Sequence, residues 1–287
     1  MLTLIGQTAT KAPAKKGFGT VPHIAFNYSQ AVGDVSKYGP GFTFNALSKE
    51  DFARFNPSVL GLGDISRNGE YIQALVAFFD LEGFTDFCGQ VDSHLVIPEF
   101  LSRYMNWLFQ TLAEQFYESA DETTVKLWGS LPFYVKFMGD GLLFIWNTDL
   151  CRGFPGTVNI AQNLLAVNNL YTDHFLTDVR KAVSNPPIRL RCGIARGQVI
   201  SIGGGADFVG SCINVASRLQ KLSNLSFAVS RRGFDLSEAP DGEGSFRSFL
   251  VLKRTAVRSI GKQELVYIRT DEFAALSPAE KLEFRDP

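Results

Sequence analysis

Cysteine is scarce in this sequence, and a long hydrophobic run is absent. The chain of 287 residues contains four cysteines, at positions 88, 151, 192 and 212. They have no Cys-x-x-Cys spacing, which argues against a disulfide framework or a zinc site and favours a reducing compartment. No run approaches the roughly 18 apolar residues of a membrane span, and residues 1–7 are too short for a signal peptide. We therefore expect a cytoplasmic protein with no membrane partner.

An excess of charge of either sign is also lacking. Lys and Arg number 28 and Asp and Glu 29, so no basic surplus indicates binding to the phosphates of a nucleic acid. Hydrophobic residues make up 45% of the chain, which is enough for one large core or for a core with an accessory region. The composition predicts a globular protein without a nucleic-acid partner.

The first 70 residues lack the periodicity of the rest. Residues 12–17 (APAKKG) show no apolar pattern, and glycines follow at positions 19, 33, 39 and 41. A short helix is expected over residues 49–55. We expect residues 1–70 to form an N-terminal arm, which either packs as an extension without chemistry or helps to shape the active site or a dimer contact. Residues 71–287 would then form the second region, the catalytic domain.

From residue 71 the patterns indicate an α+β fold. Residues 75–80 are uniformly apolar up to an aspartate, as in a central strand covered on both faces. A long helix is expected from Pro98, which would lie just inside its start, and a hairpin is expected around Gly139-Asp140-Gly141. The remaining predictions are a helix over 158–183, paired strands over 188–194 and 198–202, a helix over 213–222, and strands over 227–230, 249–253 and 265–268. This order predicts a mainly antiparallel sheet flanked by helices, close to a ferredoxin-like core.

Two carboxylates follow apolar runs beside glycines. Asp80 ends the first predicted strand and Gly83 follows it, while Asp140 follows a second apolar run over residues 131–135. Carboxylates at strand ends beside tight backbone suit divalent metal ions that face a triphosphate. The pattern predicts phosphoryl-transfer chemistry.

Three motifs in the same order resemble a known family. They are residues 79–85 (FDLEGFT), 136–140 (KFMGD) and 207–219 (DFVGSCINVASRL). Together they resemble the catalytic domain of class III nucleotidyl cyclases over about residues 72–270. The resemblance implies the ferredoxin-like class III core, a nucleoside triphosphate substrate and release of pyrophosphate.

The resemblance also implies a metal half of the site. Asp80 and Asp140 would bridge two Mg²⁺ or Mn²⁺ ions in each active site, and the Leu81 carbonyl would fill a further position. The turn at Gly83, Phe84 and Thr85 would offer backbone N–H groups to the phosphates, since glycine permits a close approach.

The third motif implies residues that act on the transition state. Asn214 and Arg218 are four residues apart and share one face of a helix. Arg218 would meet the α-phosphate where negative charge grows, and Asn214 would orient the ribose. Where family members often place a lysine for the terminal phosphates, this chain has Ile260 before a glycine, and Lys262 is the candidate substitute.

Lys136 and Asp207 match the pair that reads the base in adenylyl cyclases. A donor and an acceptor suit adenine, but cytosine and uracil offer comparable edges, so the pair leaves the base open. Phe137 stands where adenylyl cyclases usually carry a small residue, and Tyr71 and Phe208 are further aromatic residues that either narrow the site or belong to the core.

Residues 78–88 (FFDLEGFTDFC), 107–109 (WLF) and 203–214 (GGGADFVGSCIN) are most similar to the Pycsar group, bacterial anti-phage enzymes that make cyclic pyrimidine nucleotides. This implies a cUMP synthase that feeds a separate cyclic-nucleotide-binding effector, since the cCMP-forming relatives carry an additional C-terminal domain. Cytidylate cyclase and adenylyl cyclase remain alternatives, and an inactive nucleotide-binding regulatory module is a third. The family also implies a homodimer with composite active sites, for which this one chain supplies every role.

Overall fold

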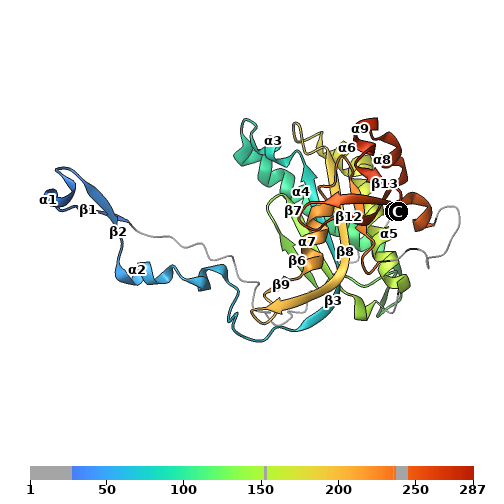
Figure 1. The fold of residues 1–287 in the computed structure, drawn as a ribbon, viewed down its shortest axis with the longest axis horizontal. Coiled ribbons are helices and arrows are strands. Elements are labelled where there is room, and N and C mark those ends of the chain that lie inside the picture. The colour runs from blue at the N-terminus through green and yellow to red at the C-terminus, as the bar shows by residue number, and fades with distance from the viewer. Residues whose placement is uncertain (1–27, 152–153, 235, 237–244) are drawn as a thin grey trace. The chain divides into compact units, whose positions relative to one another are not determined.

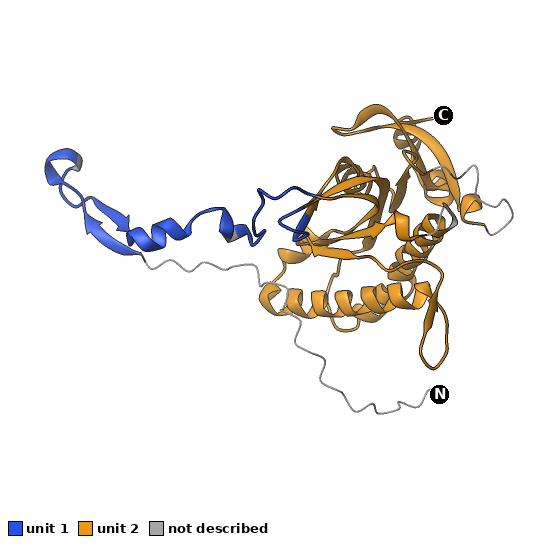
Figure 2. Ribbon diagram, turned by 90° about the horizontal axis from the view of Figure 1, so that it is seen from below, with its two compact units in different colours: residues 1–69, 202–207 blue, residues 70–201, 208–287 orange. Residues whose placement is uncertain are grey.

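The computed structural model describes residues 28–151, 154–234, 236 and 245–287. It divides into two compact units (Figure 2), of which the first comprises residues 1–69 and 202–207 and the second residues 70–201 and 208–287. The loop expected over residues 12–17 lies outside the described part of the chain. Each unit is described by itself below.

The first unit contains a hairpin and short helices. Strands β1 (Ser29–Val32) and β2 (Thr43–Ala46) pair antiparallel around α1 (Val35–Tyr38); the sequence patterns did not predict this hairpin. The expected short helix is confirmed as α2 (Lys49–Arg54), whose first turn is capped by the Ser48 hydroxyl. A 3₁₀ turn, η1 (Pro57–Leu60), follows. No residue of α2 is buried, so this helix contributes nothing to a core within the described chain.

The second unit is built on a large, mainly antiparallel sheet (Figure 1). Its order is β13-β11-β12-β10-β8-β3-β7-β6, with β9 paired to β8. Among the described pairs, β8 and β10 alone run parallel. The bounds are β3 (Tyr71–Glu82), β6 (Tyr134–Phe137), β7 (Gly141–Asn147), β8 (Arg189–Ile202), β9 (Asp207–Val209), β10 (Phe227–Ser230), β11 (Leu250–Val257), β12 (Gly261–Arg269) and β13 (Phe284–Arg285). The expected mainly antiparallel α+β fold is confirmed.

Residues 74–79 of strand β3 are all apolar because both faces of the strand are covered there. Its residues 75, 77, 79 and 81 pack into the core beneath α4 (Ser93–Phe116) and α5 (Phe154–Leu170), which we call the α4/α5 core. Residues 74, 76 and 78 pack into a second core beneath α7 (Ser211–Leu219), the α7 core. Successive side chains of a strand point to opposite faces, so Asp80 lies on the α7 side of the sheet, near the end of β3.

Two predicted helices differ at their ends. Helix α4 begins at Ser93, so Pro98 lies more than one turn inside the helix and not at its start. The helix expected over residues 158–183 is present as α5, which continues through a π turn, η3 (Tyr171–Phe175), into α6 (Leu176–Val179). The remaining elements of this unit are α3 (Phe84–Cys88), the hairpin β4 (Tyr117–Ala120) and β5 (Val125–Leu127), η2 (Thr148–Leu150), η5 (Phe246–Phe249), α8 (Thr270–Ala275) and α9 (Pro278–Lys281).

The prediction of two paired strands over residues 188–194 and 198–202, with a turn at Arg196 and Gly197, is wrong. Residues 189–202 form β8, one continuous strand of 14 residues. A Cβ on Gly197 would lie 3.0 Å from the Cβ of Cys212 at the start of α7. The glycine therefore accommodates a helix that packs on the strand, and a turn is not its role.

Candidate functional site

The two carboxylates meet at the end of β3. Asp80 pairs with Gly141 in the β3–β7 ladder, and the Leu81 amide donates a hydrogen bond to the Asp140 carbonyl at 3.3 Å. A Cβ on Gly141 would lie 2.3 Å from the Phe79 carbonyl oxygen, so only glycine permits this approach of the strands. Gly139 has φ +93°, in the region that favours glycine. The Gly-Asp-Gly sequence thus holds Asp140 beside Asp80.

Asp80 is a buried carboxylate. It is 8% exposed, and this burial raises its pKa above the usual value. The charges of Asp140 and Glu82 raise the pKa further, while those of Lys221 and Arg191 lower it. The Lys221 Nζ lies 3.9 Å from Asp80 Oδ1. Carboxylates of like charge at a buried strand end favour occupancy by a cation.

The donor set fits a hard divalent ion. The N–H and the C=O of one strand residue point to the same side, so the Leu81 carbonyl faces the β6–β7 turn that carries Asp140. Two carboxylates and one carbonyl are oxygen donors of the kind that Mg²⁺ and Mn²⁺ prefer, with substrate phosphates and water completing the shell. No group of three or more His, Cys, Asp or Glu side chains that could hold a metal occurs within the described residues. This arrangement suits an ion shared with a phosphate substrate.

The predicted phosphate turn follows directly. Gly83 has φ +85° and precedes α3, whose Phe87 amide donates to the Gly83 carbonyl at 2.9 Å. Phe84 packs against the α4/α5 core and thereby anchors the turn, while Thr85 is exposed. The first amides of a helix have no partner within the helix, so the N–H groups at positions 84 and 85 remain for a ligand, which stays a prediction.

Asn214 and Arg218 lie on the exposed face of α7, whereas Val215 and Leu219 on the opposite face are buried. The helix lies directly on the backbone of β8. A Cβ on Gly193 would approach the Ala216 carbonyl oxygen to 2.2 Å. The glycine therefore fixes the height of α7 above the sheet, and with it the place of both polar side chains.

The candidate base-reading residues are not brought together within one unit. Lys136 is half-buried on β6 opposite Leu143, which belongs to the α7 core, so Lys136 shares its face of the sheet with Asp80. Phe137 pairs with Leu142 on the opposite face and is 46% exposed. Asp207 begins β9 and belongs to the first unit. The roles of all three in base selection remain predictions.

The two other aromatic residues have different environments. Tyr71 is 68% exposed, so the reading of Tyr71 as core is wrong. Phe208 is buried, and its ring packs edge-on against Tyr134 with centroids 4.8 Å apart. Phe208 thus supports the Lys136 strand from within the α7 core.

Lys262 is exposed at the start of β12 and far from Asp80 of the same chain. Asp80 is level with Arg191 on β8, whereas Ile268 on β12 is level with Gly193 through β10. Gly193 is two residues beyond Arg191, and Lys262 lies six residues further in the same direction, so the offset from the level of Asp80 is roughly 26 Å along the strands at 3.3 Å per residue. Any phosphate that both residues touch requires a second chain.

Charged residues around Asp80 were not predicted. Arg191 on β8 donates from Nε to Glu82 Oε2 at 3.0 Å, and Arg189 approaches the same carboxylate at 3.4 Å. Lys221 follows α7, three residues after Arg218, and no local pattern distinguishes it. Their proximity to Asp80 arises from sheet register and from the packing of α7 on β8, which a single sequence does not reveal.

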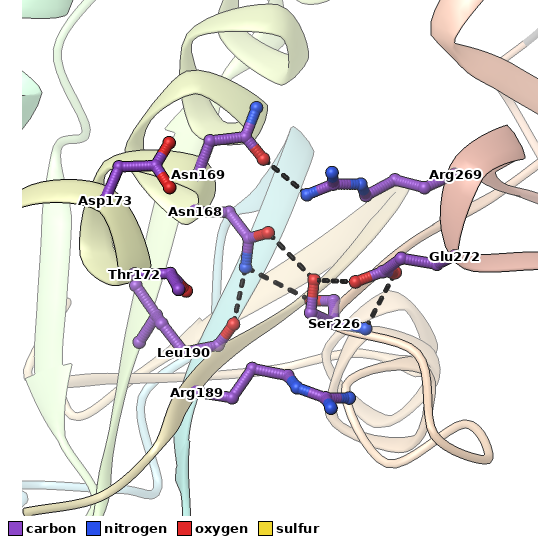
Figure 3. Close-up of a pocket in the computed structure, with 9 residues that line it drawn as sticks. All are labelled: Asn168, Asn169, Thr172, Asp173, Arg189, Leu190, Ser226, Arg269 and Glu272. Atoms are coloured by element: carbon purple, nitrogen blue, oxygen red, sulfur yellow. Dashed lines mark hydrogen bonds between the residues drawn. The ribbon is translucent and has the colours of Figure 1, made fainter. Parts of the chain in front are cut away.

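A polar cavity of about 350 Å³ lies beside the start of β8, where Arg189 and Leu190 line it (Figure 3). Asn168 donates to the carbonyls of Leu190 and Ser226, and the Ser226 amide donates to Glu272. Leu190 is the β8 partner of Leu81. The polar side chains in Figure 3 pair largely with one another, so this network supports the strand beside the carboxylates and is not the candidate site.

None of the helices in the described residues is long and apolar enough to cross a membrane. No protein-family model matches the chain, and no curated protein matches it either. Solved structures do match. The adenylyl cyclase CyaB from P. aeruginosa is 17% identical with a TM-score of 0.52, covering 71% of this chain and 97% of that chain. The guanylyl cyclase Cya2 is 16% identical with a TM-score of 0.45, covering 71% and 94%.

At such identities the similarity concerns the fold. The match to CyaB covers 71% of this chain, and the large, mainly antiparallel sheet with helices on both faces makes up most of the second unit. The chain therefore has the α+β fold of the nucleotidyl cyclase catalytic domains.

Proposed function

We propose that this protein is a class III nucleotidyl cyclase, a lyase that converts a nucleoside triphosphate to the 3′,5′-cyclic monophosphate and pyrophosphate. The observation that carries the proposal is the approach of Asp140 to Asp80 at the end of β3, where Asp80 pairs with Gly141 and the Leu81 amide donates to the Asp140 carbonyl, on the cyclase fold. In the reaction the ribose 3′-oxygen bonds to the α-phosphorus while the bond to the bridging oxygen of pyrophosphate breaks.

The residues of the chain divide into a metal half and a transition-state half. Asp80, Asp140 and the Leu81 carbonyl hold the metal. Two Mg²⁺ or Mn²⁺ ions supply neutralisation of charge on the attacking and leaving oxygens. Residues 83–85 bind the phosphates through backbone N–H groups. Arg218 stabilises the charge that develops at the α-phosphate, and Asn214 fixes the ribose.

The placement of these residues supports a homodimer with shared sites. Lys262 lies roughly 26 Å along the strands from Asp80 of its own chain. Asn214 and Arg218 point away from their own sheet. In the proposed dimer, one chain supplies Asp80 and Asp140, and its partner supplies the transition-state pair together with the base-reading residues.

The proposed substrate is UTP, and the proposed product is cUMP. The support is the similarity of residues 78–88, 107–109 and 203–214 to the Pycsar group. In that role the enzyme acts in the cytoplasm against phage infection and signals to a separate effector that binds the cyclic nucleotide. The presence of Lys136 and Asp207, which match the pair that reads the base in adenylyl cyclases, supports one alternative, an adenylyl cyclase, the activity for which CyaB is named. A cytidylate cyclase is the other alternative.

Incubation of the purified protein with Mn²⁺ and each of ATP, GTP, CTP and UTP separately tests the proposal, with products identified by mass spectrometry. We expect cUMP from UTP and no product from the Asp140→Ala variant. Cyclic AMP as the sole product would replace UTP by ATP as substrate. No cyclic nucleotide from any of the four, with the protein folded and dimeric, would leave the inactive regulatory module as the better description.

A further inference from the structure

Lys221 is a cation at the candidate metal site with no role in the proposed reaction so far. Its Nζ lies 3.9 Å from Asp80 Oδ1, and its side chain is 57% exposed while that of Asp80 is 12% exposed. The ammonium therefore approaches a buried carboxylate from the solvent side, which is the side from which a metal ion or a phosphate must also enter.

The position of Lys221 is fixed by the backbone. Its amide donates to the Arg218 carbonyl at 3.1 Å, as the helix ends. The preceding residue, Gln220, is 5% exposed, and its backbone nitrogen would lie 2.4 Å from a Cβ on Gly193. The root of the Lys221 side chain is thus held on the sheet near Gly193, which pairs with Phe78 two residues before Asp80, and only the flexible four-carbon stem is free to move.

The neighbouring arginines have another partner. Arg191 pairs with Glu82 at 2.8 Å, and Arg189 pairs with Glu82 at 3.4 Å and donates to the Asn224 carbonyl at 2.7 Å. These contacts hold both guanidinium groups near the end of β3 and the start of β8. Lys221, in contrast, has the reach and exposure to change partner.

We propose that Lys221 alternates between two anions: it is the counter-ion of Asp80 when no metal is bound, and it contacts the triphosphate when metal is bound. A divalent ion held by Asp80 and Asp140 repels the ammonium, and the phosphates attract it. Lys221 would then supply a cation for the terminal phosphates from the same chain as the carboxylates. It would replace the lysine that family members often carry at the position of Ile260. This inference rests on the proposed metal site and deepens it.

The first test measures Mn²⁺ affinity without nucleotide, by titration with detection of free Mn²⁺ by electron paramagnetic resonance. In Lys221→Met the competing charge is absent, so Mn²⁺ should bind about fivefold more tightly, the effect of a partly exposed ion pair. Lys221→Arg keeps the charge and should bind Mn²⁺ like the wild type. Lys181→Met is the matched control and should change nothing, because the Nζ of exposed Lys181 pairs with Asp178 at 2.7 Å and with neither Asp80 nor Asp140.

The second test uses tripolyphosphate with saturating Mn²⁺, a probe that has no base and cannot cyclise. Calorimetric titration should show binding about fivefold weaker in Lys221→Met than in the wild type. Mn²⁺ affinity unchanged in Lys221→Met would refute the counter-ion role, and unchanged tripolyphosphate affinity would refute the phosphate contact. Neither readout needs turnover. A cyclase that is active, loses activity on Asp140→Ala and shows no effect of Lys221→Met would overturn this inference alone.

Discussion

Replacement of Asp80 by asparagine should stabilise the metal-free protein while it removes the response to metal. Asparagine has the shape of aspartate but no charge, and burial raises the pKa of Asp80, so ionised Asp80 costs stability at neutral pH. The variant loses the contact with Lys221 at 3.9 Å, but a pair with a mostly exposed lysine contributes about 0–1 kcal/mol. The net gain should be about 1 kcal/mol, typical of neutralised functional residues, or roughly 2–4 °C in Tm.

In excess Mn²⁺ the wild type should be more stable than the Asp80→Asn variant. A ligand at 100 times its Kd stabilises the folded state by about 2.7 kcal/mol, and the Asp80→Asn variant should lack that gain. Thermal unfolding of both proteins in EDTA and in excess Mn²⁺ is the assay, with Asp80→Asn higher in EDTA and wild type higher in Mn²⁺. Glu82→Gln is the control on the same strand. It breaks the 2.8 Å pair with Arg191 and should destabilise the protein by about 1–3 kcal/mol in both buffers.

The pH dependence has a definite sign. Because the pKa of Asp80 is raised in the folded state, the group favours folding below its ordinary value of 3.8, and that contribution is lost as pH rises through the folded pKa. The advantage of Asp80→Asn over wild type in EDTA should therefore be full at neutral pH and shrink towards pH 4. A variant less stable than wild type in EDTA at pH 7, or one with an undiminished Mn²⁺ response, would refute the reasoning.

Three further predictions concern packing and assembly. Gly141→Ala places a methyl group 2.3 Å from a β3 carbonyl oxygen, so it should cost about 1–3 kcal/mol and weaken Mn²⁺ binding; unaltered unfolding and binding curves would contradict the need for glycine there. Gly193→Ala, which would meet the backbone of α7 at 2.2 Å, should likewise lower Tm, by roughly 2–10 °C, in calorimetry. An Asp80→Ala chain mixed with an Arg218→Ala chain should regain activity at one site per dimer, and inactive but well-formed heterodimers would exclude composite sites.

The strand that carries the proposed metal ligand Asp80 was predictable because its signal is local. Residues 75–79 are apolar without alternation, and the structure shows that two cores require this. The turn at Gly139 was equally local, since its positive φ is required by the hairpin itself, whereas Gly141 makes room for the Phe79 carbonyl of β3. Where backbone geometry and chemistry coincide in a few adjacent residues, the sequence suffices.

Packing between distant residues was not predictable from one sequence. Gly197 resembles a turn residue in isolation, yet it lies in the middle of a strand and makes room for Cys212. Lys221 has no local signature, and its approach to Asp80 depends on how α7 rests on Gly193. Lys262 was predicted from its place in a motif, yet in the structure it lies towards the opposite ends of the strands from Asp80.

The central position of β3 determines the order in which the protein loses its function during partial unfolding. Strand β3 is hydrogen-bonded on both sides and buried on both faces, so its amides belong to the region that opens last and exchanges hydrogen most slowly. Edge strand β6, which carries Lys136, has one partner strand in the sheet and opens earlier. Under mild denaturation β6 should fray while β3 remains folded, so Lys136 should lose its position, and with it any part in substrate discrimination, before Asp80 does.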